Sequence, residues 1–173
     1  MKTLFSKLLV LVGLAMFVGT PLLNAQTYKY VGADNCKMCH KNPKKGGQFQ
    51  AWEAGPHAKA MESLKGDEKN DPKCLKCHST AAAVDNSLHA GIKQSEGVSC
   101  ESCHGPGSAY KSMSVMRNHK ASLSKGMTMP EKEVCIACHN EESPTFKGFD
   151  YDEYVKKIAH GDPTKDKSFM KRF

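Results

Sequence analysis

The chain has 173 residues, with 25 lysines and arginines against 18 acidic residues, eight cysteines and one tryptophan. Outside the N-terminus, large aliphatic residues are too thinly scattered to bury the apolar area that offsets chain entropy. Lysine is spread along the sequence, so a nucleic-acid-binding surface is disfavoured. Something other than aliphatic side chains must build the core.

The N-terminus has the pattern of a secretory leader. Lys2 and Lys7 precede an apolar run at residues 8–18, and Leu23-Asn24-Ala25 can serve as a cleavage site. The run is shorter than the roughly 20 apolar residues that cross a bilayer. We expect a signal peptide at residues 1–25, one domain at residues 26–173 without a membrane span, and a location in the periplasm or otherwise outside the cytoplasm.

Helical patterns follow in the mature part. Residues 48–65 carry helix-spaced apolar side chains with a kink at Gly55-Pro56, and residues 131–139 follow a proline suited to a first turn. Between them, residues 81–84 and 89–93 flank a polar turn and favour a short β-hairpin.

The last predicted helix spans residues 150–159. Asp150 fits the N-cap of this helix, and Glu153, three residues later, can return a hydrogen bond to the Asp150 amide as in a capping box. Gly161 and Pro163 are expected to end the helix. Its expected apolar stripe consists of Tyr151, Tyr154, Val155 and Ile158.

All the cysteines fall in four copies of Cys-x-x-Cys-His, the signature of covalent haem attachment. Two thiols at this spacing can each form a thioether to one haem vinyl group, and the histidine then binds the iron. Disulfides or zinc sites would explain the paired cysteines but not the histidine that follows every pair. The attachment residues are Cys36, Cys39, Cys74, Cys77, Cys100, Cys103, Cys135 and Cys138, and the proximal ligands are His40, His78, His104 and His139.

Four covalently bound haem c groups, each with its iron, supply the missing core. The predicted fold is mostly α with irregular loops, a small multihaem cytochrome organised around four stacked haems. Removal of the leader leaves a net charge of +5, and about eight propionates move the loaded protein to about −3. The net charge of the polypeptide therefore differs in sign from the net charge that a redox partner would meet.

Each iron needs a sixth ligand or keeps an open position. Two strong ligands favour outer-sphere electron transfer, whereas an open face can bind a small molecule. Methionine ligation by Met61, Met113 or Met116 is the less favoured alternative to histidine. The histidines outside the motifs, equal in number to the haems, are His57, His89, His119 and His160.

Three stretches resemble the tetrahaem cytochrome c-554 family of nitrifying bacteria: residues 52–64 (WEAGPHAKAMESL), 97–107 (GVSCESCHGPG) and 149–156 (FDYDEYVK). In that family, electrons pass from hydroxylamine oxidoreductase towards membrane cytochromes, which implies redox proteins as partners here. The resemblance also implies axial pairs: His57 with the haem on His104, His119 with the haem on His40, and His160 with the haem on His139.

The same resemblance implies a five-coordinate haem on His78. His89 has no counterpart in the family, and ligation by His89, or by a neighbouring subunit, would close that position. We expect an electron shuttle between redox proteins and not an enzyme, because no nucleophile, acid pair or phosphate loop is present. The alternatives are reduction of nitric oxide or a similar molecule at the haem on His78, and a polymeric haem wire.

Overall fold

The structure is a computed structural model in which residues 27–161 are described. The predicted signal peptide and Pro163 lie outside these residues. None of the helices between residues 27 and 161 has the length and apolar character required to cross a membrane.

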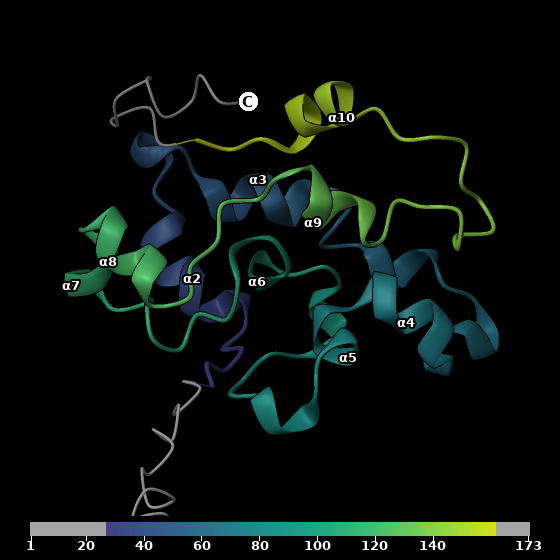
Figure 1. The fold of residues 1–173 in the computed structure, drawn as a ribbon, viewed down its shortest axis with the longest axis horizontal. Coiled ribbons are helices and arrows are strands. Elements are labelled where there is room, and N and C mark those ends of the chain that lie inside the picture. The colour runs from purple at the N-terminus through teal and green to yellow at the C-terminus, as the bar shows by residue number, and fades with distance from the viewer. Residues whose placement is uncertain (1–26, 162–173) are drawn as a thin grey trace, which may run out of the picture.

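Short helices joined by irregular loops make up residues 27–161, with no sheet (Figure 1). The only strand-like pairing in this range is an isolated bridge between Tyr30 and His89. The mostly α fold class is therefore confirmed. The α-helices are α2 (Ala33–His40), α3 (Gln48–Ala54), α4 (Pro72–His78), α5 (Thr80–Ala83), α6 (Cys100–His104), α7 (Met113–Met116), α8 (His119–Ser124), α9 (Lys132–Ile136) and α10 (Tyr151–Ile158). The 3₁₀ helices are η2 (Pro43–Lys45), η3 (Ala60–Ser63), η4 (Gly66–Asn70), η5 (Asn86–Leu88) and η6 (Gln94–Glu96).

The side-chain core is small. Phe49 of α3 packs against Trp52 with 5.3 Å between ring centroids, and the Lys37 ammonium of α2 lies 4.8 Å from the Phe49 ring. Few other apolar side chains between residues 27 and 161 are buried, which fits a core completed by a cofactor. They are Val31, Ala33, Leu64, Leu75, Ala81, Ile92 and Tyr110.

Each haem-attachment motif lies in or just after a short helix. The helices α2, α4 and α6 end at the motif histidine, and after α9 a hydrogen bond of 2.9 Å from His139 N to Cys135 O continues the turn. Asp71 caps α4 by accepting from Lys73 N at 2.8 Å, and Pro72 occupies its first position. This helical turn brings both cysteines and the histidine of a motif to one side of the backbone.

One prediction about local structure was confirmed only in part, and another was wrong. The helix expected at 48–65 is broken, because Gly55 is extended (ψ 168°) before Pro56, and only η3 resumes further on. The hairpin expected at 81–93 is absent from the described structure. Ser79 caps α5 through a hydrogen bond from Ala82 N (3.4 Å), so this alanine-rich stretch forms a helical turn.

The C-terminal helix prediction was largely confirmed. Asp150 caps α10 by accepting from Glu153 N at 2.9 Å. The Glu153 carboxylate does not complete the reciprocal bond in this structure but accepts from Lys157 Nζ at 2.6 Å. Tyr154 in the expected stripe is 43% exposed, while the rest of the stripe is half-buried.

Candidate haem-binding site

Thiols from different motifs approach one another, although each motif is expected to bind its own haem. All eight cysteines are free, and none is paired in a disulfide. In each case the two thiols of different motifs interact electrostatically. The contacts are Cys36 with Cys100, Cys103 with Cys135, and Cys138 with Cys77.

These contacts place the motifs in the spatial order first, third, fourth, second. The ion pair between Lys76 and Glu142 adds a second link between the second and fourth motifs. Figure 1 agrees, since α4 with the second motif lies at the opposite end of the molecule from α7 and α8. The attachment points therefore form a row that does not follow the sequence order.

The thiols are shielded where the motifs meet. Burial raises the pKa of Cys103 to about 11, and burial together with the neighbouring Cys77 raises the pKa of Cys138 to about 12. Both groups are thus neutral thiols at neutral pH before haem is attached. A neutral thiol oxidises slowly, so these cysteines remain available for thioether formation.

Two pairs of histidine rings lie close to each other, each pair joining a motif histidine to a histidine outside the motifs. The ring centroids of His57 and His139 are 6.1 Å apart, and those of His104 and His160 are also 6.1 Å apart. An iron bound to two imidazoles at about 2 Å each separates the ring centroids by about 6.3 Å. The residues present therefore fit a six-coordinate haem iron in both places.

These pairs differ from those that the family resemblance implies. His57 was expected to serve the haem on His104 and His160 the haem on His139, whereas the ring of His57 lies nearest that of His139 and the ring of His160 nearest that of His104. The axial assignments therefore stay predictions. The position of the His57 ring has a local reason. Val98 N donates to His57 O (3.0 Å) and Trp52 Nε1 donates to Val98 O (2.8 Å), and these bonds hold His57 beside the third motif but with its ring against the fourth.

Hydrogen bonds orient several of these imidazoles. The Nδ1–H groups of His78, His104 and His160 donate to the backbone carbonyls of Ala60 (2.8 Å), Thr128 (3.4 Å) and Ile158 (2.9 Å) respectively. Histidine that binds a metal through Nε2 commonly donates its other N–H in this way. Each bond leaves Nε2 with a free lone pair for iron.

Burial also favours the neutral, metal-binding form of the imidazole. It lowers the pKa values of His57, His104 and His139, and the neighbouring His139 lowers that of His57 further. At neutral pH these rings therefore carry no charge that would oppose iron binding.

His89 is oriented differently. Its Nε2–H donates to Ala81 O at 2.8 Å, whereas His78, His104 and His160 use Nδ1 for their hydrogen bonds to backbone carbonyls. Its backbone also pairs with Tyr30. This placement gives no support to ligation of the haem on His78 by His89. His119, expected to serve the haem on His40, is the exposed first residue of α8, and its ligation stays a prediction.

Sequence reasoning missed a buried carboxylate in the third motif. Glu101 is 1% exposed and accepts hydrogen bonds from Val31 N (2.9 Å), Gly32 N (2.8 Å) and Gly107 N (2.6 Å). Charge-assisted bonds of this kind are stronger than neutral ones. The sequence signal that could have indicated this role is the single acidic residue between the two cysteines of an attachment motif.

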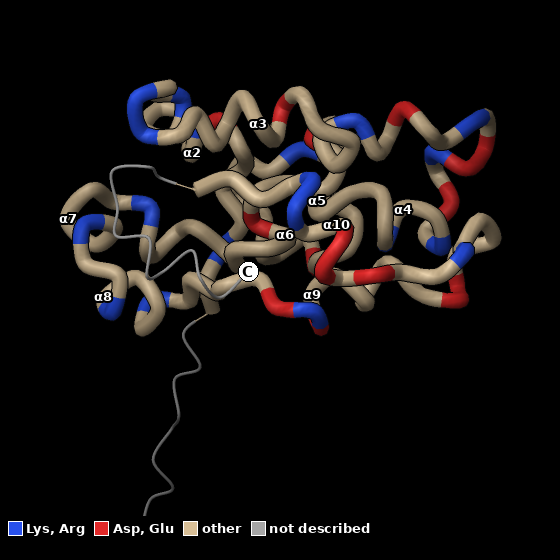
Figure 2. Tube along the Cα trace, turned by 90° about the horizontal axis from the view of Figure 1, so that it is seen from above, with Lys and Arg blue, Asp and Glu red and all other residues tan. Residues whose placement is uncertain are grey.

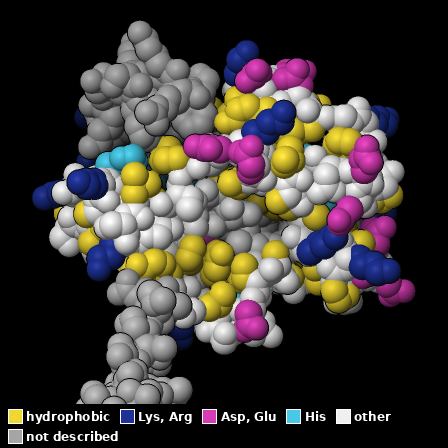
Figure 3. All heavy atoms as spheres, viewed as in Figure 1, with side chains coloured by type: hydrophobic (Ala, Val, Ile, Leu, Met, Phe, Trp, Pro, Cys, Tyr) yellow, Lys and Arg dark blue, Asp and Glu magenta, His cyan; other side chains and the backbone are white. Residues whose placement is uncertain are grey.

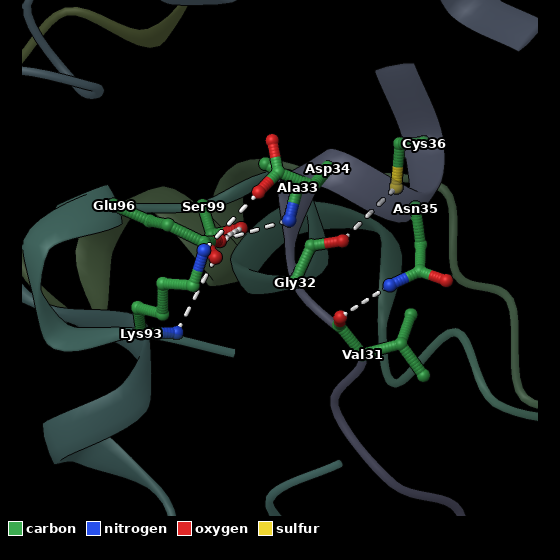
Figure 4. Close-up of polar contacts among 9 residues, drawn as sticks. All are labelled: Val31, Gly32, Ala33, Asp34, Asn35, Cys36, Lys93, Glu96 and Ser99. Carbon is green, nitrogen blue, oxygen red and sulfur yellow. Dashed lines mark hydrogen bonds and ion pairs between the residues drawn. The ribbon is translucent and has the colours of Figure 1, made fainter. Parts of the chain in front are cut away.

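A second carboxylate strengthens the same junction (Figure 4). Glu96 accepts from Ala33 N at 2.8 Å and from Ser99 Oγ at 3.0 Å, and so satisfies an N-terminal amide of α2. Lys93 of the same segment pairs with Asp34 at 3.2 Å. Glu96 and Glu101 together fasten the first motif to the third.

An aromatic stack supports the fourth motif. The Phe149 ring lies parallel to the His139 imidazole, with 4.7 Å between centroids and 15° between planes. Tyr154 stacks on the other side of Phe149 at 5.3 Å, and Lys157 Nζ lies 4.3 Å from the Tyr154 ring. This stack leads from the proximal histidine to the surface of α10.

Comparison with known proteins agrees with the motif and its surroundings. The family model for cytochrome c554 and c-prime matches residues 35–105, which contain three of the four motifs. Cytochrome c-554 of Nitrosomonas europaea is 28% identical over 176 residues, or 75% of this chain and 73% of that protein. No solved structure matches the chain significantly. The chain is thus similar to the cytochrome c-554 family, and this similarity supports a c-type cytochrome that carries electrons.

Proposed function

We propose that this protein is an exported tetrahaem cytochrome that shuttles electrons between a donor and an acceptor protein. The order of the attachment motifs supports the proposal, because haems bound at all four motifs would lie in a row from α2 to α4. A row of closely spaced centres lets electrons enter at one end of the protein and leave at the other.

Haem, when bound, supplies an iron that alternates between the ferric and ferrous states. The polypeptide attaches each group through two thioethers and orients its axial imidazoles. We assign His57 and His139 to one iron, and His104 and His160 to another, since each pair has the separation of two axial ligands. Buried carboxylates and the hydrogen bonds made by histidine Nδ1 would give the four haems different reduction potentials.

A spectroelectrochemical titration of the exported protein tests the shuttle. We expect reversible reduction of four haems in one-electron steps, with no substrate required. A protein that carries fewer than four reducible haems, or that is reduced irreversibly, would contradict the proposal. Fractionation of the host cell checks the location, which we expect to be the periplasm.

The orientation of His89 favours one second activity, binding of a small molecule at the haem on His78. With His89 Nε2 donating to Ala81, the imidazole nearest in sequence is turned to another partner. Carbon monoxide is a suitable probe, and we expect it to bind rapidly to one ferrous haem in four. If no haem binds carbon monoxide, every iron has two strong ligands and the protein acts only as a conductor.

A further inference from the structure

Positive charge is concentrated at one end of the molecule. Residues 102–130 contain no aspartate or glutamate but four cationic side chains, all exposed. Figure 2 shows α7 and α8 carrying blue segments without red. No ion pair within residues 27–161 uses these cations. They are Lys111, Arg117, Lys120 and Lys125.

The neighbouring part of the chain is acidic. Residues 131–153 contain seven carboxylates against two lysines. Figure 2 shows red segments at α9 and α10, away from α7 and α8, and Figure 3 shows acidic side chains in the region of α9 and α10. The polypeptide charge thus differs in sign between these two segments, and a negatively charged partner would be oriented as it approaches.

Apolar side chains are exposed within the basic segment. Met113 of α7 is 59% exposed and Leu123 of α8 is 41% exposed. Few large apolar side chains elsewhere in residues 27–161 are as exposed as Met113. An apolar centre with a charged rim is the usual composition of an interface between proteins.

The same segment borders two attachment motifs. Lys111 Nζ donates to Asn35 Oδ1 at 2.7 Å, next to Cys36. Thr128 N donates to His104 O and Thr128 Oγ1 donates to Cys103 O, both at 2.9 Å. A protein bound here would lie against the first and third motifs, at one end of the row of haem positions.

We propose that the basic face, defined as Lys111, Arg117, Lys120 and Lys125 around Met113 and Leu123, is the docking surface for an acidic redox protein. The inference rests on the proposed shuttle and adds to it the site of contact and the charge of the partner. The contact brings the partner's redox centre to the haem held by Cys36 and Cys39. One electron crosses, the donor is oxidised, a ferric iron is reduced, and no bond is made or broken.

Flavodoxin, a small acidic electron carrier, is the probe for this surface. Its hydroquinone gives up one electron and becomes the semiquinone while one ferric haem becomes ferrous. We would measure the Kd of oxidised flavodoxin by calorimetry and the rate of reduction by stopped flow, both at low and high ionic strength. The test variant carries Arg117→Glu with Lys120→Glu.

A matched variant with Lys69→Glu and Lys73→Glu has the same net charge and alters exposed side chains at the opposite end, near α4. We expect the Arg117/Lys120 variant to bind flavodoxin about tenfold more weakly at low salt, and the Lys69/Lys73 variant to change by less than about twofold. The difference should disappear near 1 M salt, where the screening length is about 3 Å.

Equal losses in both variants, or no loss in either, would overturn the basic face as the docking surface. So would tighter binding to anionic phosphatidylserine vesicles that the Arg117/Lys120 variant abolishes, since a membrane would then be its occupant. Failure of the shuttle itself is distinguishable, because the unaltered protein would then not be reduced reversibly even by small mediators.

Discussion

The imidazole of His160 lies beside that of His104, with 6.1 Å between ring centroids and 73° between ring planes. The two residues come from the end of the chain and from its middle, so a shared iron would close a large loop of the polypeptide. Cross-links that close long loops stabilise a fold mainly by restricting the unfolded chain. Axial ligation would thus stabilise a protein with few buried side chains.

Removal of a sixth ligand should change the spin state of one iron. In each of the variants His57→Ala and His160→Ala we expect one additional high-spin ferric haem in four, because the opposite imidazole, His139 or His104, becomes the only axial ligand. Electron paramagnetic resonance of the four-haem protein measures this directly.

His89→Ala is the matched control, since its Nε2–H donates to Ala81 O. Its spectrum should equal that of the unaltered protein. A new high-spin haem in the His89→Ala variant would show that His89 is a ligand, and an unchanged His57→Ala spectrum would refute the pairing with His139.

Glu101→Gln should destabilise the junction between the first and third motifs. The glutamine amide keeps one acceptor oxygen but places an NH₂ group against backbone N–H donors. Some of the hydrogen bonds from the amides of Val31, Gly32 and Gly107 would therefore be lost. We expect a loss of about 2–3 kcal/mol in the free energy of unfolding, measured by denaturant titration of the loaded protein.

The exposed Glu133 provides the comparison for Glu101. Glu133→Gln should change the unfolding free energy by less than about 0.5 kcal/mol. Removal of the buried charge should also raise the lowest haem potentials, whereas the Glu133 variant should leave them unchanged. Equal stability of the two variants would mean that the Glu101 carboxylate does not hold this junction.

Gly97 is required where the third motif meets the backbone of His57. Its φ of 65° with ψ of −137° suits glycine, and a Cβ at this position would lie 2.6 Å from His57 O. Gly97→Ala should therefore both destabilise the protein by more than about 2 kcal/mol and displace His57, visible as a high-spin signal.

Gly66→Ala separates strain from steric overlap, because Gly66 also has a positive φ (51°) but a Cβ added there would meet no atom within 4 Å. This variant should cost about 1 kcal/mol and leave the spin state unchanged. Similar behaviour of the two alanine variants would argue against a steric role for Gly97.

Phe149 should fix the rotation of the His139 imidazole through its parallel stack. Phe149→Leu is expected to cost about 1 kcal/mol and to shift the g values of one low-spin haem, since these values depend on the relative orientation of the axial rings. Phe149→Tyr retains the ring and should retain both properties. Unchanged g values in the Phe149→Leu variant would show that Phe149 contributes to packing but does not fix the orientation of the His139 ring.

Sequence reasoning succeeded where the signal is local. The Asp150 cap depends on residues within one turn of each other, and the structure contains this cap. The attachment motifs are equally local, and haem attachment at them stays a prediction. The hairpin at 81–93 failed because a short alternation competes poorly with the Ser79 cap.

The axial pairs depend on packing between distant segments, which no local pattern encodes. His57 is directed by Val98 and Trp52, and the roles of Glu96 and Glu101 follow from amide groups at residues 31–33. These contacts are set by the way the haem-bearing helices assemble. Their identities could therefore only come from the folded structure.

The intact mass of the exported protein, measured under denaturing conditions, tests the central claim most directly. Four thioether-bound haems predict a mass equal to the polypeptide from residue 26 onward plus four haem groups, with no free thiol left to alkylate. A mass with fewer haems, or cysteines that react with an alkylating reagent, would contradict a tetrahaem cytochrome.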